Sequence, residues 1–236
     1  MLFYYGIIIK VSYMKKKKLD IIYEDKKIIV VNKPSGLLTV SSANEKERTL
    51  YHEVSSYLKK SNPKAKVFII HRLDKDTSGI VMFAKDKETK YLYQNNWDNL
   101  VKERCYIAVV NGVLETKKGK VTSYLKETKT LLVYSSNDKK NGKLAITNYS
   151  VIKENKRYSL LDIEIKTGRK NQIRVHMKDI NHPIVGDKKY GNKRSFTNRL
   201  MLHAYKLVII NPKSKKKMEF ISKTPKLFED MFKEVK

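Results

Sequence analysis

The chain has 236 residues, of which 41% are apolar, so it is long enough to bury a core and short enough to form one domain. Its formal net charge of +27 predicts a polyanionic partner, with nucleic acid as the first candidate. A solvated basic surface without a function is the alternative. The single cysteine, Cys105, excludes a disulfide framework and a multi-cysteine zinc site, and it fits a reducing cytoplasm.

The first residues are apolar but do not resemble a membrane segment. The run from Leu2 to Ile9 is interrupted by Lys10, well short of the ~20 residues that cross a bilayer. The lysines follow the apolar run instead of preceding it, which argues against a secretory signal. We expect residues 1–18 to be an extension outside the core, with Met14 as the usual start of translation.

The first half of the chain predicts a hairpin, two helices and three further strands. The hairpin spans residues 21–31 and turns at residues 24–27. Apolar residues recur at helical spacing in residues 49–60, and residues 86–102 have the composition of a surface helix. Strands are predicted at residues 67–70, 80–85 and 104–111.

The second half predicts an antiparallel meander followed by mixed elements. Its strands lie at residues 121–125, 131–134, 144–151, 161–165 and 205–210. A short helix is predicted at residues 171–180. A final helix is expected to begin with Thr224 as N-cap and Pro225 at its first position, and to bury an apolar face of Leu227, Phe228, Met231, Phe232 and Val235.

Strands and helices alternate without a regular β-α-β repeat, which predicts an α+β fold with a largely antiparallel, mixed sheet and flanking helices. No linker marks a boundary, so we expect residues 19–236 to form a single catalytic domain. The chain contains neither a P-loop nor a Gly-x-Gly-x-x-Gly fingerprint, and we expect no nucleotide cofactor.

The most informative segment is residues 71–79, which read His-Arg-Leu-Asp-Lys-Asp-Thr-Ser-Gly. Asp74 follows Arg72 by two positions and precedes a turn, and the apolar run after it predicts a strand buried on both faces. A carboxylate beside positive charge at the edge of a rigid element is typical of a reactive site. The alternative is a polar turn that leads into a core strand.

Several separated motifs resemble those of the RluA-type pseudouridine synthases, over residues 21–212. They are Lys33-Pro34-x-Gly36, the segment at residues 71–79, Arg104-x-Tyr106-x-Ala108-x-Val110-x-Gly112, Gly168-Arg169-x-x-Gln172-Ile173-Arg174-Val175-His176, His182-Pro183-Ile184-x-Gly186-Asp187 and Leu202-His203-Ala204. The resemblance implies a fold with a central catalytic cleft. It also implies isomerisation of uridine to pseudouridine in RNA, without a metal or other cofactor.

In that family the residue matching Asp74 is the essential catalytic group, and an arginine matching Arg174 holds it. A guanidinium within hydrogen-bonding reach would favour the ionised carboxylate and orient it. Tyr106 is expected to stack on the extruded base and to assist removal of the C5 proton. A core tyrosine is the alternative reading of Tyr106.

Four further residues are expected to bind the substrate. Arg72 would enter the RNA where the base has left, or would pair with Asp76. Lys33 would contact a phosphate or pair with an acidic residue. Ile173 and Leu202 would line the uracil pocket, although a core role fits them equally well.

The chain departs from the family at Lys170-Asn171, where Thr-His is more usual, so a protonation role for that histidine is in doubt. The histidines of the chain lack metal-ligand spacing, and we expect no metal site. Only 32 residues precede Lys33, so we expect no S4-type RNA-binding domain.

The substrate expected from the resemblance is large-subunit ribosomal RNA, with transfer RNA as the runner-up. A catalytically silent RNA-binding protein and a hydrolase that uses His71 with Asp74 are the competing functions. We expect a cytoplasmic monomer that binds RNA and has no contact with membranes.

Overall fold

The computed structural model describes residues 18–41, 48–191, 197 and 199–233. The proposals on residues 1–17, including the start at Met14, and on Val235 lie outside these ranges. In chain order the elements are β1 Ile21–Glu24, β2 Ile28–Lys33, α1 Leu50–Ser61, β3 Phe68–Ile69, β4 Ser78–Ala84, α2 Lys87–Asn95, α3 Trp97–Leu100, β5 Val101–Asn111, β6 Lys118–Glu127, β7 Val133–Ser136, β8 Lys143–Glu154, β9 Tyr158–Ile165, α4 Gln172–Asp179, β10 Leu202–Ile210, β11 Lys217–Ile221 and α5 Lys226–Asp230.

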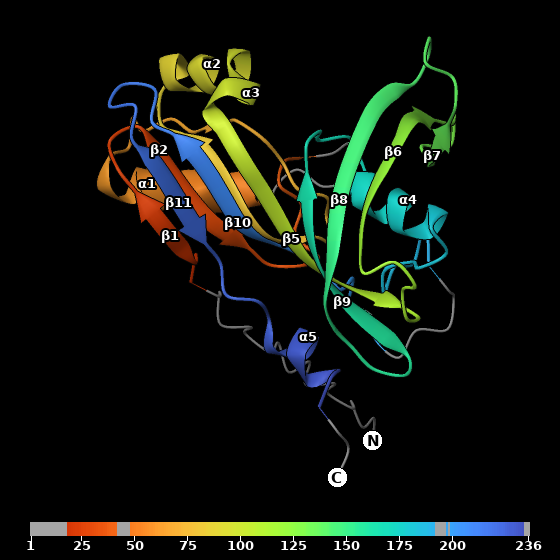
Figure 1. Ribbon diagram of the computed structural model, residues 1–236. Coiled ribbons are helices and arrows are strands. Elements are labelled where there is room, and N and C mark those ends of the chain that lie inside the picture. Colours follow the sequence, from red (N-terminus) through yellow and green to blue (C-terminus); the bar gives the residue numbers. More distant parts are fainter. Residues whose placement is uncertain (1–17, 42–47, 192–196, 198, 234–236) are drawn as a thin grey trace, which may run out of the picture.

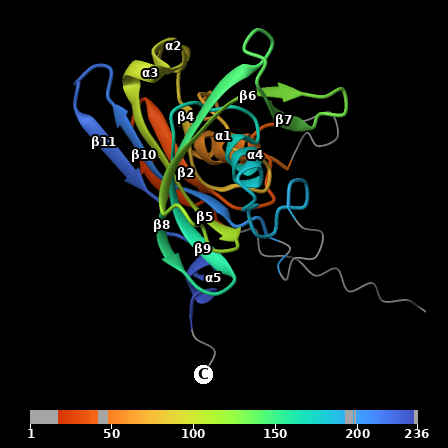
Figure 2. The same cartoon turned by 45° about the vertical axis from the view of Figure 1, so that its right-hand side comes forward.

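All the strands named above belong to one 11-stranded sheet with the order β1-β2-β4-β10-β5-β9-β8-β6-β7, to which β11 and β3 add at β10 and β4. The β4–β10 pair is parallel, and the other pairs are antiparallel. The predicted α+β class with a mixed, largely antiparallel sheet is therefore confirmed. Figure 2 shows β11 and the β6–β7 hairpin at opposite sides of the molecule.

The strands β2 and β4 are buried on both faces, because helices cover each face of the sheet at these strands. Alternate residues such as Ile29 and Phe83 pack against α1 on one face. Their neighbours Ile28 and Met82 pack with Tyr93 of α2 and with Leu100 of α3 on the other. The period of two along these strands assigns successive apolar side chains to separate cores.

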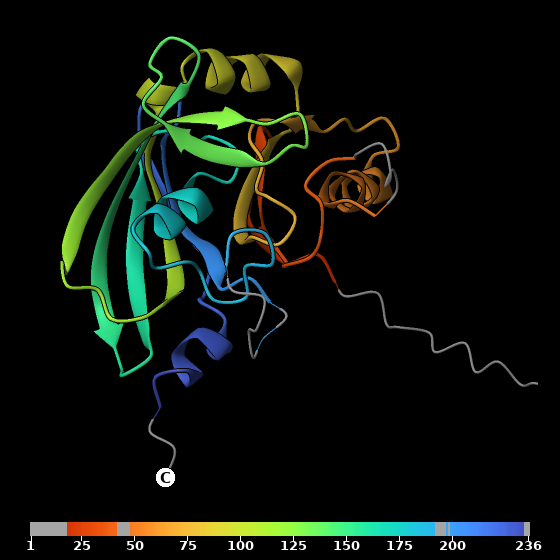
Figure 3. The ribbon, with the colours of Figure 1, turned by 90° about the vertical axis from the view of Figure 1, so that its right-hand side faces the viewer.

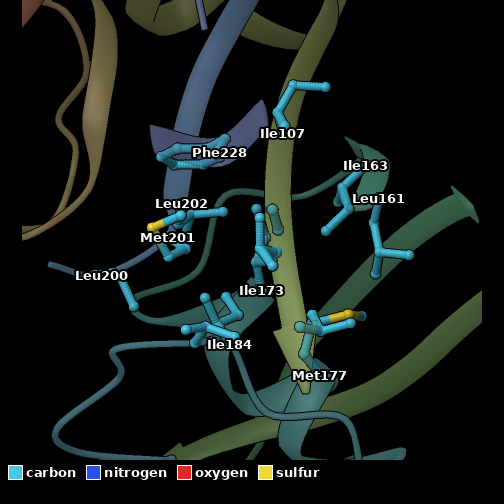
Figure 4. Close-up of a cluster of buried hydrophobic side chains, with 14 of the residues drawn as sticks. Ile107, Leu161, Ile163, Ile173, Met177, Ile184, Leu200, Met201, Leu202 and Phe228 are labelled. Atoms are coloured by element: carbon cyan, nitrogen blue, oxygen red, sulfur yellow. The ribbon is translucent and has the colours of Figure 1, made fainter. Parts of the chain in front are cut away.

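A third core joins β5, β9 and β10 to α4 and α5 (Figure 4). Ile173 and Met177 of α4 and Phe228 of α5 contribute to it, and each of the three is at most 5% exposed. In Figure 3, α5 lies at the end of the molecule opposite to α2. The helix α4 is therefore anchored on the central strands, which fixes the residues at its start.

Three elements differ clearly from the sequence-based expectation. The helix predicted over residues 86–102 is divided at Asn96, whose side chain donates to Leu92 O and ends α2. The lysine-rich segment at residues 213–221 contains an unpredicted strand, β11, which pairs with β10. The last helix is shorter than predicted, because Pro225 is its N-cap and the described helix ends at Asp230.

Candidate active site

A cavity of about 770 Å³ lies between the segment at residues 70–77 and the start of α4. It is lined by Ile70, His71, Arg72, Leu73, Asp74, Thr77, Gln94, Trp97, Asp98, Arg104, Tyr106, Ile146, Ile165, Lys166, Thr167, Gly168, Arg169, Asn171, Gln172, Ile173, Arg174 and Leu202. Six of the seven residues predicted for the site are among them. The exception is Lys33.

Lys33 is fully buried, and its ammonium group donates to three main-chain carbonyls. These belong to Pro34, Leu37 and Lys75, at 3.0, 2.7 and 2.8 Å. Burial lowers the pKa of Lys33 to about 7, against the attraction of Asp76 and Asp74. The prediction that Lys33 binds substrate is therefore wrong, because the side chain points into the protein and ties two loops together.

The segment at residues 33–39 holds the backbone on both sides of Asp74. Thr39 Oγ1 donates to Leu73 O and accepts from Leu73 N, while Ser35 Oγ donates to Asp76 O at 2.6 Å. The amide of Gly36 donates to the same Lys75 carbonyl that Lys33 binds. Because these bonds leave the Asp74 side chain untouched, they position the acid without neutralising it.

Asp74 is half-buried and faces several positive charges. Burial raises its pKa above the ordinary value, against the opposing charges of Arg174, Arg72 and Lys33 and a hydrogen bond from the Asn171 amide. The guanidinium of Arg174 favours the ionised form of Asp74 as expected, but desolvation has the larger effect on its pKa. A carboxylate with a raised pKa is a stronger base and nucleophile once it is ionised.

Arg174 lies on α4 and acts on Asp74 only at longer range. Its Nε and Nη2 both donate at 2.8 Å to the carboxylate of Asp187, which is buried. No ion pair within the described ranges joins Arg174 to Asp74, so the predicted direct hydrogen bond is wrong for this structure. Burial alone would raise the pKa of Asp187, yet the bonds from Arg174 hold that pKa below its usual range.

Asn171 occupies the position where the family more often has histidine. It adopts a left-handed conformation, with φ of 55°, immediately before α4. Its side chain accepts from Arg174 Nη1 at 3.0 Å and donates to the Tyr190 hydroxyl at 3.2 Å. Asn171 thereby links Arg174 to Asp74, since its backbone N–H donates to the carboxyl group of Asp74. Sequence reasoning missed this role and that of Asp187, although both residues lie in quoted motifs.

Tyr106 extends from the central strand β5 toward the same cavity. Burial raises its pKa to about 12, and the charge of Asp74 adds to this effect, so the phenol is neutral at physiological pH. Ile173 and Leu202 are 5% and 3% exposed and belong to the third core as well as to the cavity wall. Together the three side chains provide an apolar wall with one hydroxyl.

Arg72 and His71 are adjacent but have different surroundings. Arg72 is exposed at the cavity, and no ion pair of the described residues connects it with Asp76. His71 accepts from the Met82 amide through Nε2 at 3.0 Å, and burial lowers its pKa to about 4. An imidazole occupied in this way is a poor general base, which disfavours the hydrolase alternative.

The polar residues of the described chain do not gather in the manner of a metal site. Within the described ranges, no group of three or more histidine, cysteine, aspartate or glutamate side chains could hold a metal ion. None of the helices in the same ranges combines the length and the apolar character needed to cross a bilayer.

Comparison with known proteins identifies the family. Residues 27–179 match the RNA pseudouridylate synthase family. The chain belongs to this family. The match contains Asp74, Tyr106 and Arg174, and the predicted resemblance to RluA-type enzymes is confirmed.

Individual relatives agree with this assignment. The chain is 39% identical over 215 residues to ribosomal large subunit pseudouridine synthase D of Borreliella burgdorferi, covering 88% of this chain and 66% of that protein. It is 34% identical to tRNA pseudouridine synthase C of Haemophilus ducreyi, covering 85% and 89%. The structure of human RNA pseudouridylate synthase domain containing 4 shares the fold, with a TM-score of 0.73, 22% identity and coverage of 89% and 90%. The chain spans about two thirds of the length of the Borreliella burgdorferi protein.

Proposed function

We propose that this protein isomerises uridine to pseudouridine within RNA. The observation that carries the proposal is that Asp74, Tyr106 and Arg174, which lie far apart in the sequence, line one cavity in a chain that belongs to the pseudouridylate synthase family. In the reaction the bond from ribose C1′ to N1 breaks, the uracil turns, and C1′ joins C5. The C5 proton is then lost and N1 gains a proton, so the reaction needs no cofactor.

Asp74 is the group that acts on the ribose. As a carboxylate it can attack C1′, or it can remove the 2′ proton to give a glycal; both steps need an ionised acid in a site that excludes water. The half-buried position and the raised pKa of Asp74 suit either step. The amide of Asn171 and the charge of Arg174 oppose the cost of ionisation.

Tyr106 and the apolar wall retain the uracil while it turns. The ring of Tyr106 stacks on the base, and its neutral hydroxyl is placed to assist removal of the C5 proton. Ile173 and Leu202 support the opposite side of the base. Arg72, exposed beside the cavity, enters the space that the flipped nucleotide leaves in the RNA.

Large-subunit ribosomal RNA is the proposed substrate, because a relative with that substrate in its name is 39% identical to the chain. Transfer RNA is the second candidate, on the basis of the relative named tRNA pseudouridine synthase C. Residues 19–236 act as one catalytic domain, as a monomer in the cytoplasm. The net charge of +27 supports RNA binding by this domain itself.

The decisive test is Asp74→Asn, assayed on RNA from cells that lack the gene. We expect the variant to bind RNA with nearly unchanged affinity and to lose turnover by at least about a thousandfold, because the shape is kept while the reacting carboxylate is lost. Carbodiimide labelling measures the pseudouridine formed. Activity near that of the wild type would remove Asp74 from the mechanism.

The same assay separates the alternatives. A synthase leaves the RNA chain length unchanged and adds pseudouridine, whereas a hydrolase releases uracil or cuts the chain. A silent RNA-binding protein produces neither change. Mapping pseudouridines in ribosomal and transfer RNA from cells with and without the gene identifies the substrate.

A further inference from the structure

A second group of cavity-lining side chains takes no part in the proposed reaction. It consists of Ile70, His71, Gln94, Trp97, Asp98 and Arg104. The cavity volume of about 770 Å³ lies toward the upper end of the ~300–1,000 Å³ typical of sites for drug-sized ligands, so one uracil ring fills only part of it. The remaining space is available to the RNA on either side of the target uridine.

Arg104 is the charged centre of this second group. It lies two residues before Tyr106 on β5, and both side chains line the cavity, as the period of two along a strand requires. Figure 1 shows α3, which carries Trp97, leading directly into β5. Successive side chains on one face of a strand lie about 6–7 Å apart. This distance is close to the spacing of neighbouring nucleotides along an extended RNA chain.

The guanidinium of Arg104 is held in one orientation by its surroundings. Nη2 donates to Lys166 O at 2.8 Å, and the group lies 5.6 Å from the centre of the Trp97 ring. Gly168 leaves room for Nη1, since a Cβ atom at that position would lie 2.7 Å from it. A tilted contact with His71, at 5.5 Å between ring centres, fixes Trp97 in turn.

Arg104 has no anionic partner in the protein. No ion pair among the described residues includes it, and Asp98 and Glu164 act on it only at longer range. Among the described residues its one hydrogen-bond acceptor is a neutral carbonyl, so most of its five N–H donors are left for a ligand in the cavity. A partly buried cation without a counter-ion is costly, and the cost is recovered when an anion binds.

We propose that Arg104, backed by Trp97, binds a phosphate of the RNA chain next to the uridine held at Asp74. A planar guanidinium that is fixed along one edge presents its remaining donors to phosphate oxygens in the bidentate geometry that arginine favours. The exposed Arg169 nearby adds positive charge at the same wall. The inference rests on the proposed function, because it requires RNA in the cavity.

The test compares Arg104→Met with Arg157→Met. Both variants lose one arginine charge, but Arg157 is exposed in the turn between β8 and β9 and does not line the cavity. On RNA from cells lacking the gene, we expect Arg104→Met to raise KM by about tenfold to a hundredfold, with kcat changed less than about threefold. Arg157→Met should resemble the wild type in both constants. Equal KM values for the two variants would overturn the proposal, as would a loss confined to kcat.

Salt dependence identifies the ligand as a phosphate. Each phosphate contact contributes about 0.7–0.9 to the slope of log K against log salt concentration. The slope for Arg104→Met should therefore be shallower than that for Arg157→Met by about that amount. Reduced affinity with an unchanged slope would show that Arg104 contacts a base instead, and would contradict the proposal.

A measurement on the wild-type enzyme covers the case in which Arg104→Met does not fold. Synthetic RNAs around the mapped uridine carry a neutral methylphosphonate at one phosphate at a time. Replacement of one phosphate next to the target should raise KM by about tenfold to a hundredfold, and replacement of distant phosphates should not. If every position next to the uridine tolerates the neutral group, the inference is wrong.

The outcomes separate this inference from the proposed function. If the function fails, the wild-type enzyme forms no pseudouridine in any RNA, and the salt slopes of binding still compare the two arginine variants. If the inference alone fails, the wild-type enzyme is active and Arg104→Met behaves as Arg157→Met does.

Discussion

The two charged groups at the centre of the cavity are held in opposite ways. The loop with Asp74 is fixed through its main chain, by hydrogen bonds from residues 33–39 and by the buried ammonium of Lys33. The helix with Arg174 is fixed through the functional side chain itself, which donates three hydrogen bonds to Asp187 and Asn171. The bonds around Asp74 involve its main chain and leave its carboxylate free to react. The bonds around Arg174 involve the guanidinium itself.

This difference suits the roles proposed for the two groups. A reacting carboxylate must be able to form a new bond or accept a proton, so a direct ion pair would lower its basicity. A guanidinium that supplies only a field has no such need and is best kept immobile. In the proposed mechanism Arg174 favours the ionised form of Asp74 from a distance, while Asn171 connects the two regions.

The largest expected effect comes from breaking the Arg174 side with Asp187→Asn. Removal of one charge from a buried, doubly hydrogen-bonded pair should cost about 3–5 kcal/mol of unfolding free energy and should lower kcat, because Arg174 is no longer fixed. Urea unfolding and turnover on RNA measure the two effects. The control is Asp230→Asn, which removes an exposed carboxylate paired with Lys233 and should leave the stability nearly unchanged, because solvent screens that pair. Equal losses in the two variants would mean that the buried pair has no special role.

On the Asp74 side, Lys33→Met removes the ammonium and keeps a side chain of similar length. Three main-chain carbonyls lose their shared donor, and we expect the unfolding free energy to fall by about 2–4 kcal/mol, with KM for RNA nearly unchanged in the folded variant. Lys26→Met is the control, since Lys26 is exposed on the β1–β2 turn. A rise in KM without loss of stability would restore the substrate-binding role that the structure argues against.

The smallest expected effect, counted for each residue involved, is a loss of stability in mild acid. Burial lowers the pKa of His71, His176 and His203 to about 4. The unfolded chain binds these protons near pH 6.5 and the folded chain does not, so stability is complete above about pH 6.5 and falls as the pH decreases toward 4. Each histidine should contribute about 1–3 kcal/mol to this loss.

Unfolding at several pH values between 7.5 and 4.5 measures the slope. His176→Gln, which removes one titrating group from α4, should be less stable at pH 7.5 and should show a shallower slope. An unchanged slope would show that His176 is protonated in the folded protein as readily as in the unfolded chain.

Much of the fold could be predicted because its signals are local. The charged turn at residues 24–27, the alternation at residues 161–165 and the helical spacing of apolar residues at 49–60 each specify an element through neighbouring residues. The strand β11 could not be found in this way. Its lysines resemble a solvated loop, and the pairing with β10 that makes it a strand depends on residues outside the segment.

The sequence predicted which residues line the site, but not which partners they bind. The motifs indicated Asp74, Tyr106 and Arg174, and the structure brings all three to one cavity. The partner of Arg174 could not be deduced, because two aspartates were available and only the turn before Tyr190 decides that Asp187 lies closer. Lys33 was misjudged for a similar reason, since its acceptors are main-chain carbonyls, which any sequence would offer.

Gly79 lies in β4, directly after the segment with Asp74, and it contacts Ala204 in β10, near the other end of the chain. Its φ is +117°, and a Cβ atom there would lie 2.1 Å from Ala204 O, across the parallel contact between β4 and β10. A single added carbon would force these strands apart, and Leu202 would move relative to Asp74. The absence of a side chain at Gly79 therefore allows β4 and β10 to approach closely, and this approach helps to fix the positions of Asp74 and Leu202 at the cavity.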